Sequence, residues 1–247
     1  MSKEKVRYSI IIPTLNEEKL LPQLLKQLNE PSLKENYSIE IILSDGGSVD
    51  KTIDLAIPYV DRIKVHTDVS QQNIASGRNE GAEVAEGEIL IFINADIRFD
   101  DVFKFFDYLE SNFVNTEYSG MACKVQIFKE EEIFSDKIFH GFYNWYFRLM
   151  NICGMGMGRG ECQVVKRKVF NDMNGYNSLL AAGEDFDLFR RIRMNGKILF
   201  TNEISVYESP RRYRKYGYIN VSSSWFFNSV SVVLKNKSLS KVWEQVR

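Results

Sequence analysis

The triplet Asn94-Ala95-Asp96 places an amide and a carboxylate directly after five successive apolar residues, 89–93. An apolar run without alternation is typical of a strand buried on both faces, as in a mostly parallel sheet. The end of such a strand lies at the carboxyl edge, where open α/β sheets bind their ligands. A carboxylate there could hold a divalent cation against a diphosphate. The alternative for Asp96 taken alone is a turn residue that caps the following helix.

Two more polar segments follow apolar runs that predict strands. Pro13–Glu18 follows the first such run, and Ser44–Asp50 follows the second, so both should lie at the same edge as Asp96. The glycines beside Asp45 allow a tight turn, and Ser48 could cap the next helix. Asp45 could accept hydrogen bonds from a ribose or a base, or it could belong only to the turn.

Charged residues on two predicted helices could also act in a site. Arg78 could reach a diphosphate or a nucleobase with its planar fork, although taken alone it is more typical of a surface arginine. Glu184 and Asp185 open a helix, where acidic residues commonly complement the dipole. If Asp185 instead projects into a cleft within reach of a hydroxyl, it could serve as a general base.

The segment Ser209–Tyr218 holds four cations and three tyrosines, a set suited to clamping phosphates. It would also suit single-stranded nucleic acid, but no RNA- or DNA-binding module accompanies it. Residues 208–247 carry 8 basic and 2 acidic residues, whereas residues 1–100 carry 11 and 17. The basic tail could therefore hold an anionic substrate group, rest on an anionic membrane, or be a solvated helix.

The elements that must position these groups follow from periodicity. Strand-like and helix-like segments alternate from residue 8 to about 110, which predicts parallel strands with helices on both faces. The predicted strands are Tyr8–Ile12, Ile39–Leu43, Arg62–His66 and Glu88–Ile93, and the helices are one with leucines at 20, 21, 24, 25 and 28, one from about Val49, and Gln72–Ala85. Mixed segments follow, with a long aromatic helix near Glu131–Ile152. We expect an α/β half up to about residue 110 and a mixed half up to about 207, sharing one core, and a basic, aromatic helical extension over 208–247.

Composition indicates an ordinary globular protein, with 44% hydrophobic and 26% charged residues. Three cysteines without a CxxC pair argue for a reducing compartment and against a disulfide frame or a zinc site. No apolar stretch approaches the roughly 20 residues of a membrane span. We expect a soluble cytoplasmic protein, at most peripheral at the inner face of a membrane. The aromatic segments 138–147 and 225–227 could contact that membrane, or they could be core or a dimer seam.

Two nucleotide-binding fingerprints are missing. No G-x-G-x-x-G follows the first predicted strand, and no G-x-x-x-x-G-K-[ST] occurs. The glycine cluster Gly154–Gly160 follows a helix, so we interpret it as a flexible connection that lines the site.

Taken in order, these segments resemble the family 2 glycosyltransferases, whose fold is called GT-A, and in particular short soluble members from bacteria and archaea. The resemblance covers residues 8–207. It implies a single catalytic domain over 1–207, with a nucleotide-binding half of about 1–110 and an acceptor half of about 111–207. It is carried by YSIIIPTLNEEKLLPQLLKQL, LSDGGSVDKT, ASGRNEGAEVAEGEILIFINAD and VVKRKVFNDMNGYNSLLAAGEDFDLFRRIRMNGK. The segment SPRRYRKYGY is a looser match. Asn94 departs from the family, which most often has Asp there.

The resemblance implies a role for each matching residue. Asp96 would bind Mg²⁺ or Mn²⁺, Asp185 would be the catalytic base beside Glu184, and Arg211 and Arg212 would neutralise the leaving diphosphate. The nucleotide would be held by Pro13, Thr14, Glu17, Asp45, Gly46, Arg78, Asn94 and Ala95. The implied reaction is inverting transfer from a nucleoside-diphosphate sugar, with UDP-sugars favoured and GDP-mannose second. The acceptor would be a glycan hydroxyl or a polyprenyl phosphate, in glycan, glycolipid or cell-envelope synthesis.

Two other functions remain open on sequence grounds. A nucleotidyltransferase that forms a sugar nucleotide shares a related architecture, but no Gly-rich, Arg/Lys-bearing loop follows the first strand. A non-catalytic sugar-nucleotide-binding protein would be consistent with Asn94. Nucleic acid is not expected as a partner, and a homodimer stays open.

Overall fold

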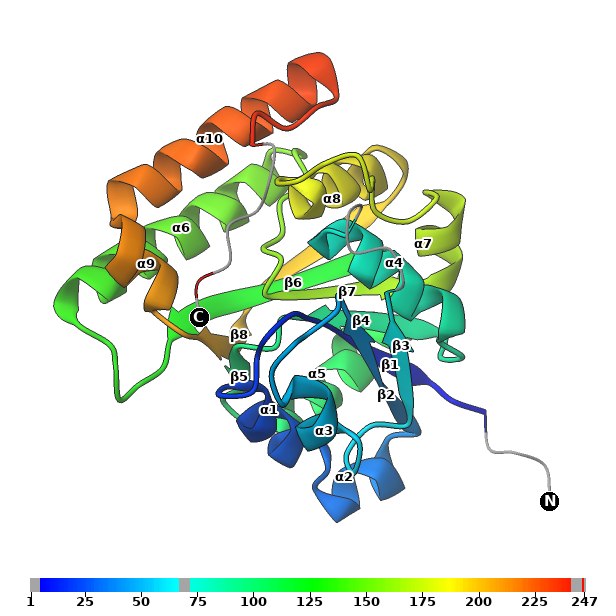
Figure 1. Ribbon diagram of the computed structural model, residues 1–247. Helices are drawn as coiled ribbons and strands as arrows, with labels where there is room; N and C mark the ends of the chain where they lie inside the picture. Colours follow the sequence, from blue (N-terminus) through cyan, green and yellow to red (C-terminus); the bar gives the residue numbers. More distant parts are fainter. Residues whose placement is uncertain (1–4, 67–71, 241–245, 247) are drawn as a thin grey trace.

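The computed structural model describes residues 5–66, 72–240 and 246 of the chain. Within these residues, one eight-stranded sheet in the order β3-β2-β1-β4-β7-β6-β8-β5 carries helices on both faces (Figure 1). The strands are β1 (Tyr8–Thr14), β2 (Ile39–Asp45), β3 (Arg62–Val65), β4 (Ile89–Ile93), β5 (Ile97–Phe99), β6 (Tyr118–Ile127), β7 (Cys162–Lys166) and β8 (Lys197–Glu208). The helices are α1 (Leu21–Leu28), α2 (Pro31–Asn36), α3 (Thr52–Ala56), α4 (Ile74–Val84), α5 (Val102–Leu109) with the π-helical turn η2 (Glu110–Val114), α6 (Phe134–Ile152), α7 (Arg167–Asp172), α8 (Glu184–Asn195), α9 (Arg211–Tyr216) and α10 (Tyr218–Lys235).

The first half of the sheet is parallel, as the alternation of strands and helices predicts. β3, β2, β1 and β4 pair side by side in the same direction. Successive side chains of a strand point to opposite faces, so Ile10 and Ile12 pack with Leu24 of α1, whereas Ile11 packs with Ala82 of α4. The apolar runs lack alternation because both faces of the sheet are covered.

The second half is mixed. β7 runs antiparallel to β4 and β6, β6 runs parallel to β8, and β5 pairs antiparallel with β8. Ile97 lies opposite Glu208 in this last pair, and Ser209 N–H donates to the backbone oxygen of Asp96 at 3.2 Å. Pairing between distant segments therefore brings the start of the basic tail to the Asn94-Ala95-Asp96 triplet.

One predicted cap is wrong. We expected Ser48 to cap a helix from about Val49, but Ser48 uses its N–H and hydroxyl to bond Asp45 (2.7 and 2.6 Å), and α3 begins only at Thr52. Asp50 accepts from Thr52 N–H at 2.9 Å instead. The next predicted helix forms as α4, with Asn73 as its N-cap.

The C-terminal helices lie beside the long aromatic helix. Figure 1 shows α10 running along α6, on the side of the sheet away from α1, α2 and α3. Tyr143 of α6 and Trp225 of α10 have ring centroids 5.3 Å apart. None of the described helices combines the length and apolar character needed to cross a lipid bilayer.

Candidate active site

A large cavity opens at the carboxyl ends of β1 and β4 and continues between α6 and α10. Its volume is about 1150 Å³. Eleven of the thirteen site residues expected from the sequence line it, which brings together segments nearly 200 positions apart. They are Pro13, Thr14, Glu17, Arg78, Asn94, Ala95, Asp96, Glu184, Asp185, Arg211 and Arg212.

The other two expected residues, Asp45 and Gly46, are not among those that line the cavity. Asp45 is fully buried, and its carboxylate accepts hydrogen bonds from Thr14 Oγ1, Gly47 N–H and both donors of Ser48 at 2.6–2.9 Å. The Gln72 side chain lies over Gly46, where an added Cβ would come within 2.1 Å of Gln72 Nε2. This placement favours the turn interpretation of Asp45, and its contact with a nucleoside stays a prediction.

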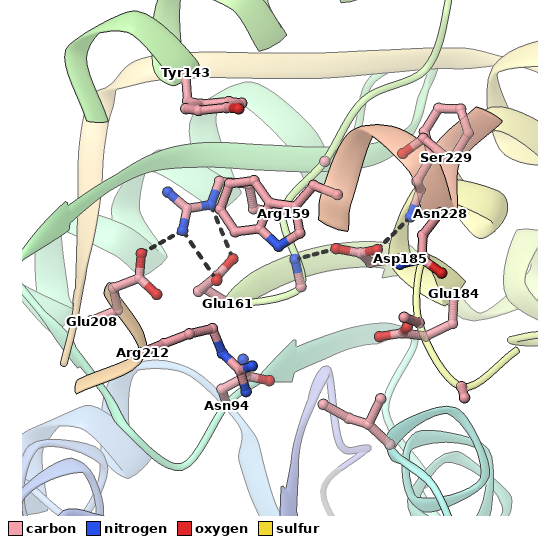
Figure 2. Close-up of a pocket in the computed structure, with 18 of the residues that line it drawn as sticks. Asn94, Tyr143, Arg159, Glu161, Glu184, Asp185, Glu208, Arg212, Asn228 and Ser229 are labelled. Atoms are coloured by element: carbon pink, nitrogen blue, oxygen red, sulfur yellow. Dashed lines mark hydrogen bonds and ion pairs between the residues drawn. The ribbon is translucent and has the colours of Figure 1, made fainter. Parts of the chain in front are cut away.

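At the edge of the sheet, Arg211 joins two acidic residues. Its guanidinium donates to both carboxylate oxygens of Glu17 (3.0 and 2.6 Å) and to Asp96 Oδ2 (2.9 Å). Burial lowers the pKa of Arg211, but the negative charges of Asp96 and Glu17 raise it by more, so its pKa lies above the ordinary value. Arg212 projects toward Asn94 in Figure 2. Burial lowers the pKa of Arg212. This end of the cavity therefore holds two guanidinium groups of the kind that binds a diphosphate, and Arg211 is paired with Glu17 and Asp96.

The fit of a divalent cation rests on few oxygen ligands. Asp96 supplies a carboxylate, and the part of the chain that the structure describes has no group of three or more His, Cys, Asp or Glu that could hold a metal. Mg²⁺ is commonly held by one or two carboxylates together with substrate phosphates. The residues present therefore fit a cation that arrives with a diphosphate, not one held by protein alone.

Arg78 organises the middle of the cavity. The sequence alone favoured a surface position for it, but the residue is fully buried. It donates to Glu184 Oε1 at 2.8 Å, to Gly160 O at 2.8 Å and to Asn94 Oδ1 at 3.1 Å. A buried guanidinium needs such partners because an unpaired charge in the interior is costly. Glu184 is therefore the counterion of Arg78, and Asn94 is oriented by the same group.

Asp185 lines the cavity beside Arg78, since both side chains bond the backbone of Gly160. Its Oδ2 accepts from Gly160 N–H at 2.9 Å, and its Oδ1 accepts from Phe186 N–H at 2.8 Å (Figure 2). Burial, and then the negative charge of Glu184, raise the pKa of Asp185 to about 7. A carboxyl group that titrates near neutral pH is well matched to taking a proton from a hydroxyl.

A second buried cluster was missed by sequence reasoning. Arg159 donates to both oxygens of Glu161 (3.1 and 3.2 Å) and to Glu208 (Figure 2). It also donates to Tyr213 Oη (3.0 Å), and its Nη1 lies 3.1 Å from His140 Nδ1. Burial raises the pKa of Glu208 to about 8, whereas burial and the Arg159 cation lower the pKa of His140 to about 3. The imidazole is therefore neutral and accepts from Arg159.

A partial signal for this cluster was present in the sequence. Arg159 and Glu161 lie within or beside the glycine stretch that we interpreted as lining the site, and this stretch does line it. Glu208 immediately precedes the basic segment. The sequence spacing did not indicate that these residues meet. Their contact depends on the sheet order, in which β6 lies between β7 and β8.

Comparison with known proteins agrees with this geometry. The model of "Glycosyl transferase family 2" matches residues 9–170. A PGL/p-HBAD biosynthesis glycosyltransferase of Mycobacterium bovis is 36% identical over 93 residues, which are 36% of this chain and 35% of that protein. A dolichyl N-acetyl-α-D-glucosaminyl phosphate 3-β-D-2,3-diacetamido-2,3-dideoxy-β-D-glucuronosyltransferase of Methanococcus voltae is 38% identical over 93 residues, 35% of this chain and 28% of that protein. The chain thus matches about a third of the length of these relatives.

Solved structures show the same fold. The mannosyltransferase PcManGT from Pyrobaculum calidifontis, in complex with GDP-Man and Mn²⁺, superposes with a TM-score of 0.74 at 16% identity and covers 94% of this chain and 65% of its own. The TarS fragment 1–349 of S. aureus superposes with a TM-score of 0.62 at 14% identity and covers 94% of this chain and 73% of its own. The fold is GT-A, and the chain belongs to glycosyl transferase family 2.

Proposed function

We propose that this protein is an inverting glycosyltransferase that moves a sugar from a nucleoside-diphosphate sugar to an acceptor hydroxyl, with Asp185 as the base. The observation that carries the proposal is the arrangement of one cavity. The half-buried Asp185 carboxyl, with a pKa of about 7, lies in one wall, and the Arg211–Asp96 pair and Arg212 lie at the sheet edge. The carboxyl could take the proton that the acceptor loses, and the arginines could neutralise the charge that develops on the leaving diphosphate.

In this mechanism, the acceptor oxygen attacks the anomeric carbon while the bond to the diphosphate breaks on the opposite face. Asp185 takes the hydroxyl proton, an effect worth about 10²–10⁴-fold in rate. Arg211 and Arg212 stabilise the negative charge that develops on the leaving diphosphate. Arg78 keeps Asn94 and Glu184 in place, because it bonds both. A Mg²⁺ or Mn²⁺ ion bound at Asp96 would supply further charge neutralisation on the phosphates.

The donor class rests on the residues of the β1 edge and on related proteins. Thr14, Glu17, Asn94 and Ala95 line the end of the cavity nearest Asp96, where a nucleotide would lie. We favour a UDP-sugar, with GDP-mannose second. Support comes from TarS, solved with UDP-GlcNAc, and from PcManGT, solved with GDP-Man and Mn²⁺. Use of Mn²⁺ or Mg²⁺ by this chain is part of the proposal.

The remaining partners are proposed on the same basis. The acceptor would be a glycan or a polyprenyl phosphate, in the synthesis of a glycan, a glycolipid or the cell envelope. The names of the relatives, which include a glycosyltransferase of PGL/p-HBAD biosynthesis and a transferase for a dolichyl sugar phosphate, support this class. We propose a cytoplasmic enzyme that works at the inner face of a membrane and does not bind nucleic acid. Whether it forms a homodimer can be tested by measuring its mass in solution.

Asp96→Ala tests the donor end. Arg211 keeps its two bonds to Glu17 in this variant, so we expect little loss of stability. In the wild type, saturating UDP or GDP should raise the melting temperature by roughly 5–10 °C, and Mn²⁺ should add to that shift. The Mn²⁺ increment and sugar transfer should both disappear in Asp96→Ala.

The matched control is Asp100→Ala, which removes a carboxylate that bonds Lys129 at 2.7 Å and does not line the cavity. This control should keep both the Mn²⁺ increment and transfer. An Asp96→Ala protein that keeps the wild-type Mn²⁺ increment would contradict the metal assignment, and near-normal turnover would contradict a role in donor binding.

A further inference from the structure

The cavity is divided by charge. Its sheet-edge half contains the arginines and carboxylates described above, whereas α6 contributes four lining residues and α10 contributes eight. Among the described residues of these two helices that line the cavity, none is charged. We call this half the α6–α10 groove, formed chiefly by Phe142 and Tyr146 of α6 and by Phe226, Val230, Val233 and Leu234 of α10.

The groove leaves large apolar side chains open to solvent. Phe142 is 53% exposed, Phe226 63% and Leu234 74%. Large contiguous apolar patches on soluble proteins usually mark a binding surface, because covering them releases the free energy of apolar hydration. These side chains line a cavity, so an occupant could contact them from several sides.

The Asn228 side chain, which lines the groove, is used by the protein itself. The Asn228 amide donates to Ser224 O at 2.8 Å, and its oxygen accepts from the backbone N–H groups of Leu239 and Ser240 at 3.0 and 3.1 Å. An acceptor rich in hydroxyls needs unused donors and acceptors to replace its water. Aliphatic side chains such as Val230 and Leu234 offer none, and this chemistry favours a hydrocarbon over a glycan.

The groove begins where the proposed base lies. Phe186, adjacent to Asp185 in the chain, belongs to one buried cluster with Val232 of α10 and Phe147 of α6. Figure 2 shows Asn228 and Ser229 of α10 beside Asp185 and Glu184. A molecule with its reactive group at Asp185 would therefore extend its other end directly between the two helices.

We propose that the α6–α10 groove binds the hydrocarbon tail of a lipid-linked acceptor. The inference rests on the proposed function, since the head group would receive the sugar at Asp185. The cavity volume of about 1150 Å³ exceeds the roughly 300–1,000 Å³ of a pocket for one small ligand, which leaves room for a donor and an apolar chain together.

The first experiment measures binding without a donor. Isothermal titration calorimetry with n-alkyl phosphates of two, six and ten carbons, below their micelle-forming concentrations, tests the tail alone. Each buried methylene should tighten binding by about fourfold, and the heat-capacity change should become more negative with chain length. Affinity independent of chain length would overturn the proposal.

Neighbouring side chains provide matched variants. Phe226 lines the cavity and Phe227 does not, although both are exposed to a similar extent (63% and 56%). On α6, Phe142 lines the cavity and Trp145 does not, with exposures of 53% and 58%. Phe226→Ser and Phe142→Ser should each weaken binding of the ten-carbon probe about tenfold or more, whereas the two-carbon probe is unaffected. Phe227→Ser and Trp145→Ser should match the wild type.

Two outcomes would assign this surface differently. Equal effects of Phe226→Ser and Phe227→Ser would show that the outer face of α10 holds the chain, as in contact with a membrane surface, and would overturn the groove. A wild-type dimer that becomes monomeric in Phe226→Ser, measured by light scattering, would show that a second copy occupies the groove and would also overturn the proposal.

The outcome is separable from the proposed function. Tail binding is measured without donor or turnover, and donor binding is measured by the melting-temperature shift with UDP or GDP. Chain-length-dependent binding without any sugar transfer would support the groove and refute the transferase proposal. Sugar transfer to a water-soluble acceptor, together with alkyl-phosphate binding that does not depend on chain length, would support the transferase proposal and overturn the groove.

Discussion

Replacing Asp185 with asparagine removes one half-buried negative charge and keeps the size of the side chain. We expect the Asp185→Asn protein to lose about 10²–10⁴-fold in transfer to a hydroxyl acceptor, because the amide cannot take a proton. The wild-type rate should rise with pH and level off above about pH 7, where Asp185 is ionised. The small remaining activity of the variant should lack this rise.

The same substitution should remove a loss of stability that the wild type has at high pH. Burial, with the charge of Glu184, raises the pKa of Asp185 to about 7, whereas the unfolded value is about 3.9. Between these two values the folded state keeps a proton that the unfolded state releases, so wild-type stability falls as pH rises and the loss is complete above pH 7. Two pH units at about 1.4 kcal/mol each amount to ~3 kcal/mol between pH 5 and pH 8.

The cost of the substitution itself does not depend on pH. Gly160 N–H and Phe186 N–H each donate to a different oxygen of Asp185, and asparagine has one oxygen, so one donor loses its partner at a cost of about 1–3 kcal/mol. That cost is the same at pH 5 and pH 8. The difference in unfolding free energy between variant and wild type should therefore shift by ~3 kcal/mol in favour of the variant over this range.

Urea unfolding followed by circular dichroism at pH 5 and pH 8 measures this shift, together with transfer rates over the same range. Asp187→Asn is the activity control, because Asp187 lies on the same helix, bonds Arg191 and does not line the cavity. That control should keep transfer. A difference in stability that is equal at the two pH values would refute the raised pKa. Transfer at near-wild-type rate by Asp185→Asn would refute the base assignment, and would favour a phosphate acceptor, whose oxygen is already anionic.

Two further substitutions test the middle of the cavity. Arg78→Met leaves the Glu184 carboxylate buried without its cation. We expect the free energy of unfolding, measured with urea, to fall by about 3–5 kcal/mol. A fall below about 1 kcal/mol would show that the pair is not needed for stability. Gly160→Ala places a Cβ 2.9 Å from Arg78 Nη2 and 3.2 Å from Asp185 Oδ2. Turnover should therefore fall at least tenfold, while circular dichroism shows a folded protein. Unchanged turnover would show that neither group needs its present position.

The parallel half of the fold could be predicted because its signals are local. Ile10, Ile11 and Ile12 need two covered faces, and such strands require helical crossovers between them. That order alone places Asp96 and Thr14 at one edge of the sheet. The position of Arg78 could not be predicted, since a helical arginine is buried only if other segments supply its partners. These partners come from the residue after β4, the glycine stretch and α8.

The mixed half shows the limit more clearly. The helix start at Glu184-Asp185 is recognisable as a motif, but the pKa of Asp185 depends on burial by elements that are distant in sequence. The cluster around Arg159 brings together four distant segments. His140 comes from α6, Glu161 from the segment before β7, Glu208 from β8 and Tyr213 from α9. No periodicity encodes such a meeting, because it depends on the order of β7, β6 and β8 in the sheet.

The sequence by itself determined the α/β architecture, the edge of the sheet at which Thr14 and Asp96 lie and the residue types available there, because strand and helix periods and the end of each strand are properties of short segments. Tertiary structure alone decided that Arg78 pairs with Glu184 and that the cavity has a charged half and an apolar half. These features depend on burial and on partners from distant segments, and only the folded chain brings those segments together.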